Sequence, residues 1–111
     1  MSKVVLISSK TMGDGEEALG EKLMKAFIYS LTEAPEMPSH VIMYNNGAFL
    51  SQEGSEAVED LKNLESQGVE ILTCGTCTDY YGIADTVAVG SITNMYEIVE
   101  LCSEADSVIR P

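Results

Sequence analysis

Positive charge is scarce in this chain of 111 residues. Six lysines and arginines stand against 18 aspartates and glutamates, which gives a formal net charge of −12. Proteins that bind nucleic acid or anionic membranes use clustered cations, whose binding releases counterions. We therefore expect no nucleic-acid partner and no membrane partner, while the charge balance leaves a basic protein partner open.

Cysteine, histidine and long apolar runs are scarce as well. The chain has three cysteines, an odd number, and one histidine. The first apolar run, Val4 to Ile7, is too short for a signal peptide or a membrane span. A disulfide framework is therefore not expected, and reduced thiols in a cytoplasm fit better. We interpret His40 as solvent-facing or structural, so a Cys–His catalytic pair lacks support.

Length and composition are those of one soluble domain. Hydrophobic residues make up 45% of the chain and charged residues 22%, which is ordinary for a globular protein. A chain of this length buries roughly 65% of its unfolded surface. We expect a single domain over residues 1–111.

Short apolar runs alternate with helical patterns along the chain. Strands are predicted at residues 4–7, 41–44, 69–73, 86–89 and 107–110. Helices are predicted at residues 16–31, from Ser55 to a stop at Gly68, and from Thr93 onward.

The start of the first helix carries two patterns. Asp14 and Glu17 have capping-box spacing. Residues 13–18 also match a dinucleotide-binding fingerprint, but Glu16 and Glu17 place negative charge where a pyrophosphate would bind, so we interpret them as a capped turn. The buried face of this helix is expected to hold Leu19, Leu23, Ala26 and Phe27.

Strands that alternate with helices imply right-handed crossovers and a parallel sheet covered on both faces. We therefore predict an α/β fold, a flavodoxin-like three-layer domain with a mostly parallel sheet of about five strands. Ligands of such sheets bind at the carboxyl ends of the strands. Three loops are expected to meet there, at residues 8–15, 45–50 and 74–82.

Two cysteines, Cys74 and Cys77, lie where the third strand is followed by a helix. Backbone N–H groups at a helix N-terminus stabilise a thiolate, which lowers the thiol pKa and makes the cysteine nucleophilic. Gly75 permits a tight turn between the two. Other interpretations stay open: two small buried hydrophobic residues, a thioredoxin-like dithiol, or half of a zinc site shared between two chains. We place Cys102 in the core, on the apolar face of the last helix.

Polar and aromatic residues near the cysteines are candidates for the same pocket. Asn45 and Asn46, before Gly47, are typical of a turn that tolerates positive φ, and they lie at the carboxyl end of a strand. There they can donate hydrogen bonds toward the sulfurs. Of the two tyrosines that follow the cysteines, Tyr80 and Tyr81, we assign Tyr80 to the pocket wall.

The run from Cys74 to Gly82 resembles the DsrE/DsrF-like family of sulfur-relay proteins. Together with residues 8–16, 44–47 and 90–97, it is similar to the C-terminal domain of YedF-type proteins, which are described as selenium metabolism proteins. The resemblance implies a DsrE-like domain that assembles into homo-oligomers, either trimers or hexamers. Relay members often have a basic residue where this chain has Tyr81. YedF-type proteins also carry an N-terminal TusA-like domain that this sequence lacks, which makes it an excised domain or a stand-alone version.

The resemblance also implies a chemistry. Relay members carry persulfide sulfur on a cysteine that is followed by a glycine at the spacing of Cys74 and Gly82. Cys74 therefore takes the carrier role and Cys77 becomes the partner thiol, which would release the cargo by thiol–disulfide exchange. Thr76 and the backbone amides after it would stabilise the thiolate.

The resulting prediction is a cytoplasmic sulfur or selenium carrier that uses a cysteine persulfide. Its partners would be donor and acceptor proteins, with TusA-like proteins as candidates, and neither a cofactor nor a metal is expected. Two alternatives remain: a non-catalytic oligomeric interaction module and a dithiol redox protein.

Overall fold

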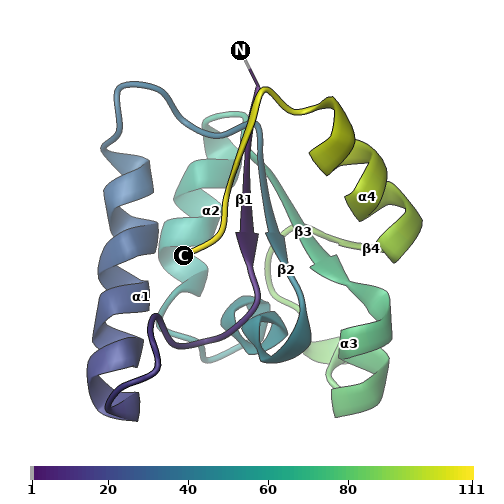
Figure 1. The fold of residues 1–111 in the computed structure, drawn as a ribbon. Coiled ribbons are helices and arrows are strands. Elements are labelled where there is room, and N and C mark those ends of the chain that lie inside the picture. The colour runs from purple at the N-terminus through teal and green to yellow at the C-terminus, as the bar shows by residue number, and fades with distance from the viewer. Residues whose placement is uncertain (1) are drawn as a thin grey trace.

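Five parallel strands form one sheet in the order β4-β3-β2-β1-β5 (Figure 1). The computed structural model describes residues 2–111. The strands are β1 (Lys3–Ile7), β2 (His40–Met43), β3 (Glu70–Cys74), β4 (Ser91–Thr93) and β5 (Ser107–Ile109). The chain steps from β1 to β4 in one direction and then returns to place β5 on the other side of β1. This order differs from the 2-1-3-4-5 order of flavodoxin itself.

Helices cover both faces of the sheet. They are α1 (Glu17–Thr32), α2 (Val58–Ser66), α3 (Gly75–Tyr81) and α4 (Met95–Glu104), with two 3₁₀ helices, η1 (Asn45–Ser51) and η2 (Ala84–Thr86). Helices α1 and α2 lie on one face and α4 lies on the other, while the short α3 follows the carboxyl end of β3 (Figure 1). The predicted three-layer α/β domain is therefore confirmed.

Side chains alternate along the inner strands β1, β2 and β3 between two apolar clusters, because these strands are buried on both faces. The first cluster lies between the sheet and helices α1 and α2, and its buried strand residues are Val5, Ile7, Val41, Met43 and Ile71. The second cluster lies beneath α4, and its buried residues are Val4, Ile42, Leu72, Cys74 and Ile98. One of the two cysteines of the candidate site is thus part of the core.

Helix α1 has the predicted length but turns a different face to the sheet. Its buried positions are Gly20, Met24, Ile28 and Thr32. Of the predicted face, Leu19, Leu23 and Ala26 are exposed, and only Phe27 packs against the first cluster. The prediction of the buried face was therefore wrong.

The rotation of α1 follows from the loop that precedes it. The backbone N–H of Met12 donates to the Gly20 carbonyl at 3.0 Å. A Cβ at Gly20 would lie 2.8 Å from the Cβ of Thr11, so this close crossing is open only to glycine. The predicted capping box was also wrong, because Glu16 occupies the N-cap position and no side chain caps the helix. Asp14 lies in the exposed loop before it.

The strand predicted at residues 86–89 was wrong. This stretch begins in η2, and Val87 makes only an isolated antiparallel bridge with Gln52. Val89 is buried in the first cluster, so this apolar side chain packs in the core although its backbone is not part of the sheet. Gly90, at φ +71°, then turns the chain into β4 and lies so close to the Ile71 carbonyl that any side chain would clash.

Two helices begin later than predicted. Before α2, which starts at Val58, the Ser55 hydroxyl accepts the N–H of Ala57 at 3.1 Å and so stabilises a turn rather than the helix end. Helix α4 is capped by Asn94, whose side-chain oxygen accepts the N–H of Glu97 at 2.8 Å. This is the usual role of an asparagine at the N-cap.

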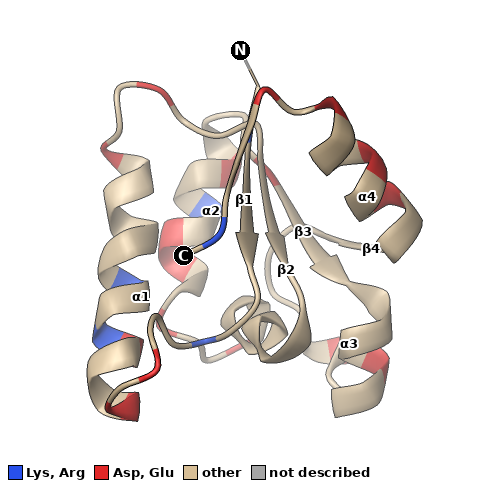
Figure 2. Cartoon of the chain, viewed as in Figure 1, with Lys and Arg blue, Asp and Glu red and all other residues tan. Residues whose placement is uncertain are grey.

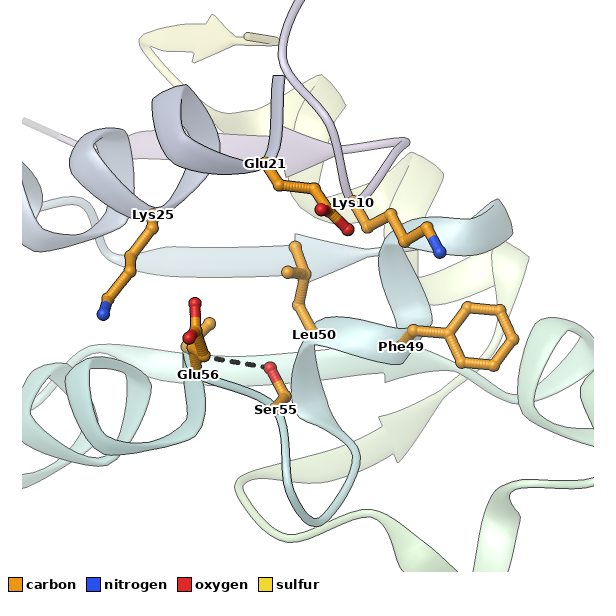
Figure 3. Close-up of a pocket in the computed structure, with 8 residues that line it drawn as sticks. Lys10, Glu21, Lys25, Phe49, Leu50, Ser55 and Glu56 are labelled. Atoms are coloured by element: carbon orange, nitrogen blue, oxygen red, sulfur yellow. Dashed lines mark hydrogen bonds between the residues drawn. The ribbon is translucent and has the colours of Figure 1, made fainter. Parts of the chain in front are cut away.

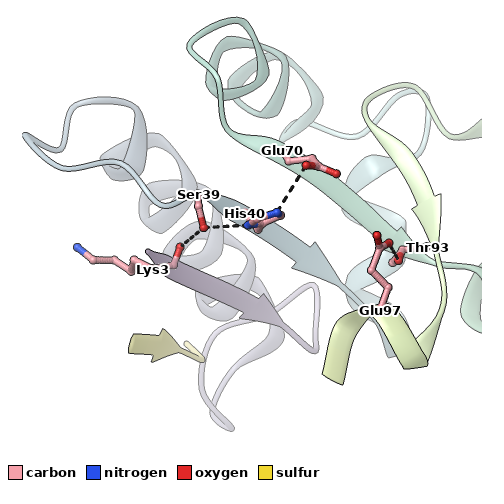
Figure 4. A network of polar contacts seen from close by, with 6 residues as sticks. All are labelled: Lys3, Ser39, His40, Glu70, Thr93 and Glu97. Carbon is pink, nitrogen blue, oxygen red and sulfur yellow. Dashed lines mark hydrogen bonds and ion pairs between the residues drawn. The ribbon is translucent and has the colours of Figure 1, made fainter. Parts of the chain in front are cut away.

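A polar network joins the first residues of the central strands (Figure 4). The Ser39 hydroxyl donates to the Lys3 carbonyl at 3.2 Å and lies 2.8 Å from Nδ1 of His40. The Nε2 of His40 lies 3.5 Å from a carboxylate oxygen of Glu70. His40 is thus a structural residue at the amino end of the sheet, which is the end opposite the cysteines.

The surface is acidic and carries several groups of exposed apolar side chains, on α1, around α4 and on β5. Acidic residues are spread over helices and loops and do not form a single tail (Figure 2). Among residues 2–111, no helix combines the length and the hydropathy that crossing a membrane would need. The exposed apolar side chains near α4 are Ile92, Met95, Tyr96 and Val99.

Candidate functional site

Cys74 is the last residue of β3 and lies at the carboxyl edge of the sheet. It pairs with Thr93 of β4 and occupies the N-cap position of α3. Its side chain points into the second cluster and the residue is only 1% exposed. The position of Cys74 therefore fits the interpretation of a small buried hydrophobic residue.

Cys77 lies one turn further along, in α3, and is half-buried. It packs against the edge of the second cluster. The backbone N–H of Asn45 donates to its Sγ at 3.0 Å, so the sulfur is held by the loop that follows β2. All three cysteines of the chain are free thiols.

The loop that contacts Cys77 is fixed by an unusual backbone conformation. Asn45 has φ +52°, the left-handed region that asparagine tolerates better than most residues. Its side-chain oxygen accepts the N–H of Asn46 at 2.8 Å and the hydroxyl of Tyr81 at 3.4 Å. The side-chain oxygen of Asn46 accepts the N–H of Lys10 at 3.0 Å. These contacts join the three loops that the sequence predicts at this edge.

The tyrosine that reaches the site is Tyr81, not Tyr80. Tyr80 is 84% exposed and makes a T-shaped ring contact with Tyr81, and no contact with a cysteine supports its assignment to the pocket. Tyr81 lies four residues after Cys77, which places both on nearly the same face of α3. Its ring lies 4.5 Å from that of Phe49. Helical spacing is therefore the signal in the sequence that favours Tyr81.

The other predicted pocket residues have mainly structural roles. Thr76 is exposed at the start of α3. Gly75 lies against β4, where a Cβ would come within 3.1 Å of the Thr93 carbonyl oxygen. Asn46 is turned toward Lys10 rather than toward a sulfur. Asn45 alone of the predicted polar residues contacts a cysteine.

The electrostatics of Cys77 differ from the sequence-based expectation of a lowered thiol pKa. Burial raises the pKa of the Cys77 thiol, the Asn45 N–H opposes this rise, and the neighbouring Cys74 thiol adds to it. The position of Cys77 in the first turn of α3 does not offset this rise. Cys77 is therefore mostly protonated at neutral pH.

The raised thiol pKa values predict how stability depends on pH. Burial also raises the pKa of Cys102. Because folding makes both thiols hold their protons more tightly, their contribution to stability is present below the ordinary thiol pKa of about 8.5 and is lost as pH rises through the folded-state values. We expect the free energy of unfolding in urea to fall less above pH ~8.5 in a Cys77→Ser/Cys102→Ser variant than in the wild type. Equal slopes would contradict this.

Two pockets border the site without containing its cysteine pair. One of about 370 Å³ lies between α1, η1 and the start of α2, and it is lined by Lys10 and Phe49 among others (Figure 3). The Nζ of Lys10 is 5.9 Å from the centre of the Phe49 ring, within reach of a cation–π contact. The other pocket, of about 400 Å³, lies beneath α4 and is lined by Tyr44 and Cys102 among others. Within residues 2–111, no group of three or more metal-binding side chains lies together.

The arrangement is that of an α/β protein with a dithiol at the carboxyl edge of a parallel sheet. The sequence model of the DsrE/DsrF-like family matches residues 40–111, and the chain belongs to this family. Membership suggests a role related to sulfur relay. The closer similarity to YedF-type proteins stays a prediction.

Solved structures share this fold over the whole chain. The ychN protein from E. coli has a TM-score of 0.76 and 20% identity, with 100% of each chain covered. MTH1491 from Methanobacterium thermoautotrophicum, a protein of unknown function, has a TM-score of 0.72 and 21% identity, again with 100% of each chain covered. BT1422 from Bacteroides thetaiotaomicron, also of unknown function, has a TM-score of 0.68 and 9% identity, with 99% of this chain and 95% of that chain covered. At such low sequence identity, the structural similarity establishes the fold and not the function. No curated protein matches the chain.

Proposed function

We propose that this protein is a cytoplasmic sulfur carrier whose Cys74–Cys77 pair accepts a sulfane sulfur, or its selenium counterpart, from a donor protein. It would pass the cargo to an acceptor protein, with TusA-like proteins as candidate partners. Membership of the DsrE/DsrF-like family supports this function. The observation that carries the proposal is the contact between Cys77 Sγ and the Asn45 N–H, beside a second thiol at the edge where α/β sheets bind ligands.

The chemistry of loading needs no cofactor. A cysteine thiolate of this protein attacks the outer sulfur of a persulfide on the donor protein. The sulfur–sulfur bond of the donor breaks, the donor cysteine leaves as a thiolate, and a new persulfide forms on the carrier. The sulfane sulfur moves without any net oxidation or reduction.

Intact-mass spectrometry tests the carrier function directly. The protein is incubated with a cysteine desulfurase and cysteine, and its mass is measured before and after treatment with a dithiol reductant. We expect the wild type and a Cys102→Ser control to gain the mass of one sulfur atom early in the reaction, and to lose it again as the Cys74–Cys77 disulfide forms or when the reductant is added. A Cys74→Ser/Cys77→Ser variant should gain none.

The alternatives give different results in the same experiment. A wild type that neither gains sulfur nor forms a disulfide would overturn the carrier function and favour an interaction module. A wild type that cycles between dithiol and disulfide, while neither it nor a Cys74→Ala variant gains sulfur, would favour a redox protein. Sulfur retained by the double variant would show that the cysteine pair is not the carrier site.

The predicted homo-oligomer remains a proposal and has a candidate surface. The exposed apolar side chains of α4 and β4 form a patch of the kind that often marks an interface. We propose that a second copy of the chain packs on this patch. Light scattering of the wild type and of Val99→Glu decides the question, since a monomeric wild type would refute it.

A further inference from the structure

The two thiols of the pair differ in how far a donor can reach them. Displacement at a persulfide needs direct access of the attacking sulfur to the sulfur that is transferred. Cys74 is 1% exposed and packs with Ile42, Leu72 and Ile98 beneath α4. A donor protein would have to separate α4 from the sheet before it could reach this sulfur.

Cys77 has the opposite properties. It is half-buried at the surface of α3, and its Sγ accepts the N–H of Asn45 at 3.0 Å. A hydrogen bond to sulfur stabilises negative charge on it, which helps both when the thiolate attacks and when it later leaves. The Tyr81 hydroxyl, 3.4 Å from the side-chain oxygen of Asn45, helps to hold this loop against the sulfur.

We infer that Cys77 is the thiol that accepts the sulfur and that the buried Cys74 is the thiol that releases it. This inference rests on the proposed carrier function, and it reverses the roles that the family resemblance implies. The Cys77 thiolate attacks the outer sulfur of the donor persulfide, and the donor cysteine leaves as a thiolate. The sulfane sulfur is then bonded to Cys77 Sγ at the protein surface.

Release follows from the second thiol. The Cys74 thiolate attacks Cys77 Sγ, the inner sulfur of the persulfide, and a Cys74–Cys77 disulfide forms. The bond between Cys77 Sγ and the sulfane sulfur breaks, and the sulfur leaves as hydrosulfide, which is the form that the acceptor protein would receive. Two electrons pass from the cysteine pair to the sulfane sulfur, so the pair is oxidised and the cargo is reduced. A dithiol reductant, of which dithiothreitol is the experimental example, restores both thiols.

Single variants locate the accepting thiol. Under the desulfurase reaction, a Cys74→Ala variant should keep the added sulfur on Cys77, because its release is blocked. Cys77→Ser should gain no sulfur. Alanine is used at position 74 because a serine hydroxyl there would be buried among apolar side chains. Urea unfolding and circular dichroism establish that each variant is folded.

A second arm does not depend on sulfur transfer. Native protein is treated with iodoacetamide and its peptides are mapped by mass spectrometry. We expect Cys77 to be alkylated about tenfold or more faster than Cys74, with Cys74 reacting fully only in denaturant. Comparable rates at the two thiols in native protein would overturn the inference.

The outcomes distinguish an error in the assignment of the two thiols from an error in the proposed carrier function. Sulfur gained by Cys77→Ser and lost from Cys74→Ala overturns the inference and leaves the carrier function standing. No sulfur on any variant or on the wild type refutes the carrier function, and the inference with it.

Discussion

Replacing Gly47 by alanine is expected to lower the free energy of unfolding by about 3 kcal/mol. Gly47 is buried in η1, where a Cβ would lie 2.5 Å from the Ile7 carbonyl oxygen and 3.2 Å from the Ser9 backbone nitrogen. These backbone atoms lie at the end of strand β1 and just beyond it, so they cannot rotate away as a side chain would. Either η1 or the end of β1 must shift. Urea unfolding followed by circular dichroism measures the loss.

The same substitution should also loosen the candidate site. Because η1 begins at Asn45, a shift of this helix moves the N–H that Cys77 Sγ accepts. We expect Gly47→Ala to load less sulfur than the wild type at temperatures where it is still folded. Gly15→Ala is the matched control, since nothing lies within 4 Å of a Cβ there. Equal free energies of unfolding for Gly47→Ala and Gly15→Ala would contradict this prediction. They would mean that η1 can move away from β1 without loss of stability.

The fold could be predicted from the sequence because its signals are local and repeated. Strands β1, β2 and β3 are short apolar runs, and burial on both faces requires this pattern whatever the neighbouring elements are. The convergence of three loops at one edge follows from parallel strands alone. The contacts of Asn45 and Asn46 with Cys77 and Lys10 confirm that convergence.

The errors came from tertiary contacts, which local sequence patterns do not record. The rotation of α1 depends on the crossing of the loop at Gly20, which no helical periodicity records. Val89 is apolar because it fills the first cluster, and the same pattern also predicts a strand. The sequence at the junction of β3 and α3 likewise does not indicate that Cys74 points into the second cluster while Cys77 stays near the surface.

Burial of Cys74 by the second cluster leads to the other large prediction. Ile42 is fully buried on β2 and lies opposite Leu72 of β3, on the same face of the sheet as Cys74. Ile42→Ala should lower the free energy of unfolding by about 3 to 4 kcal/mol, since it leaves a cavity. That cavity lies in the cluster that covers Cys74. We therefore expect iodoacetamide to alkylate Cys74 faster in the folded variant than in the folded wild type.

A variant in the other cluster separates local opening from general loss of stability. Leu61 is also fully buried, but it packs in the first cluster on the opposite face of the sheet. Leu61→Ala should cost a similar free energy, about 3 kcal/mol, and should expose Cys74 only through global unfolding. The two variants are compared at urea concentrations that give them equal free energies of unfolding. A faster reaction of Cys74 in Ile42→Ala would mean that packing beneath α4 is what keeps this thiol from a donor. Equal rates would mean that Cys74 reacts only from the unfolded chain, and that its role must be decided by sulfur loading of the single variants.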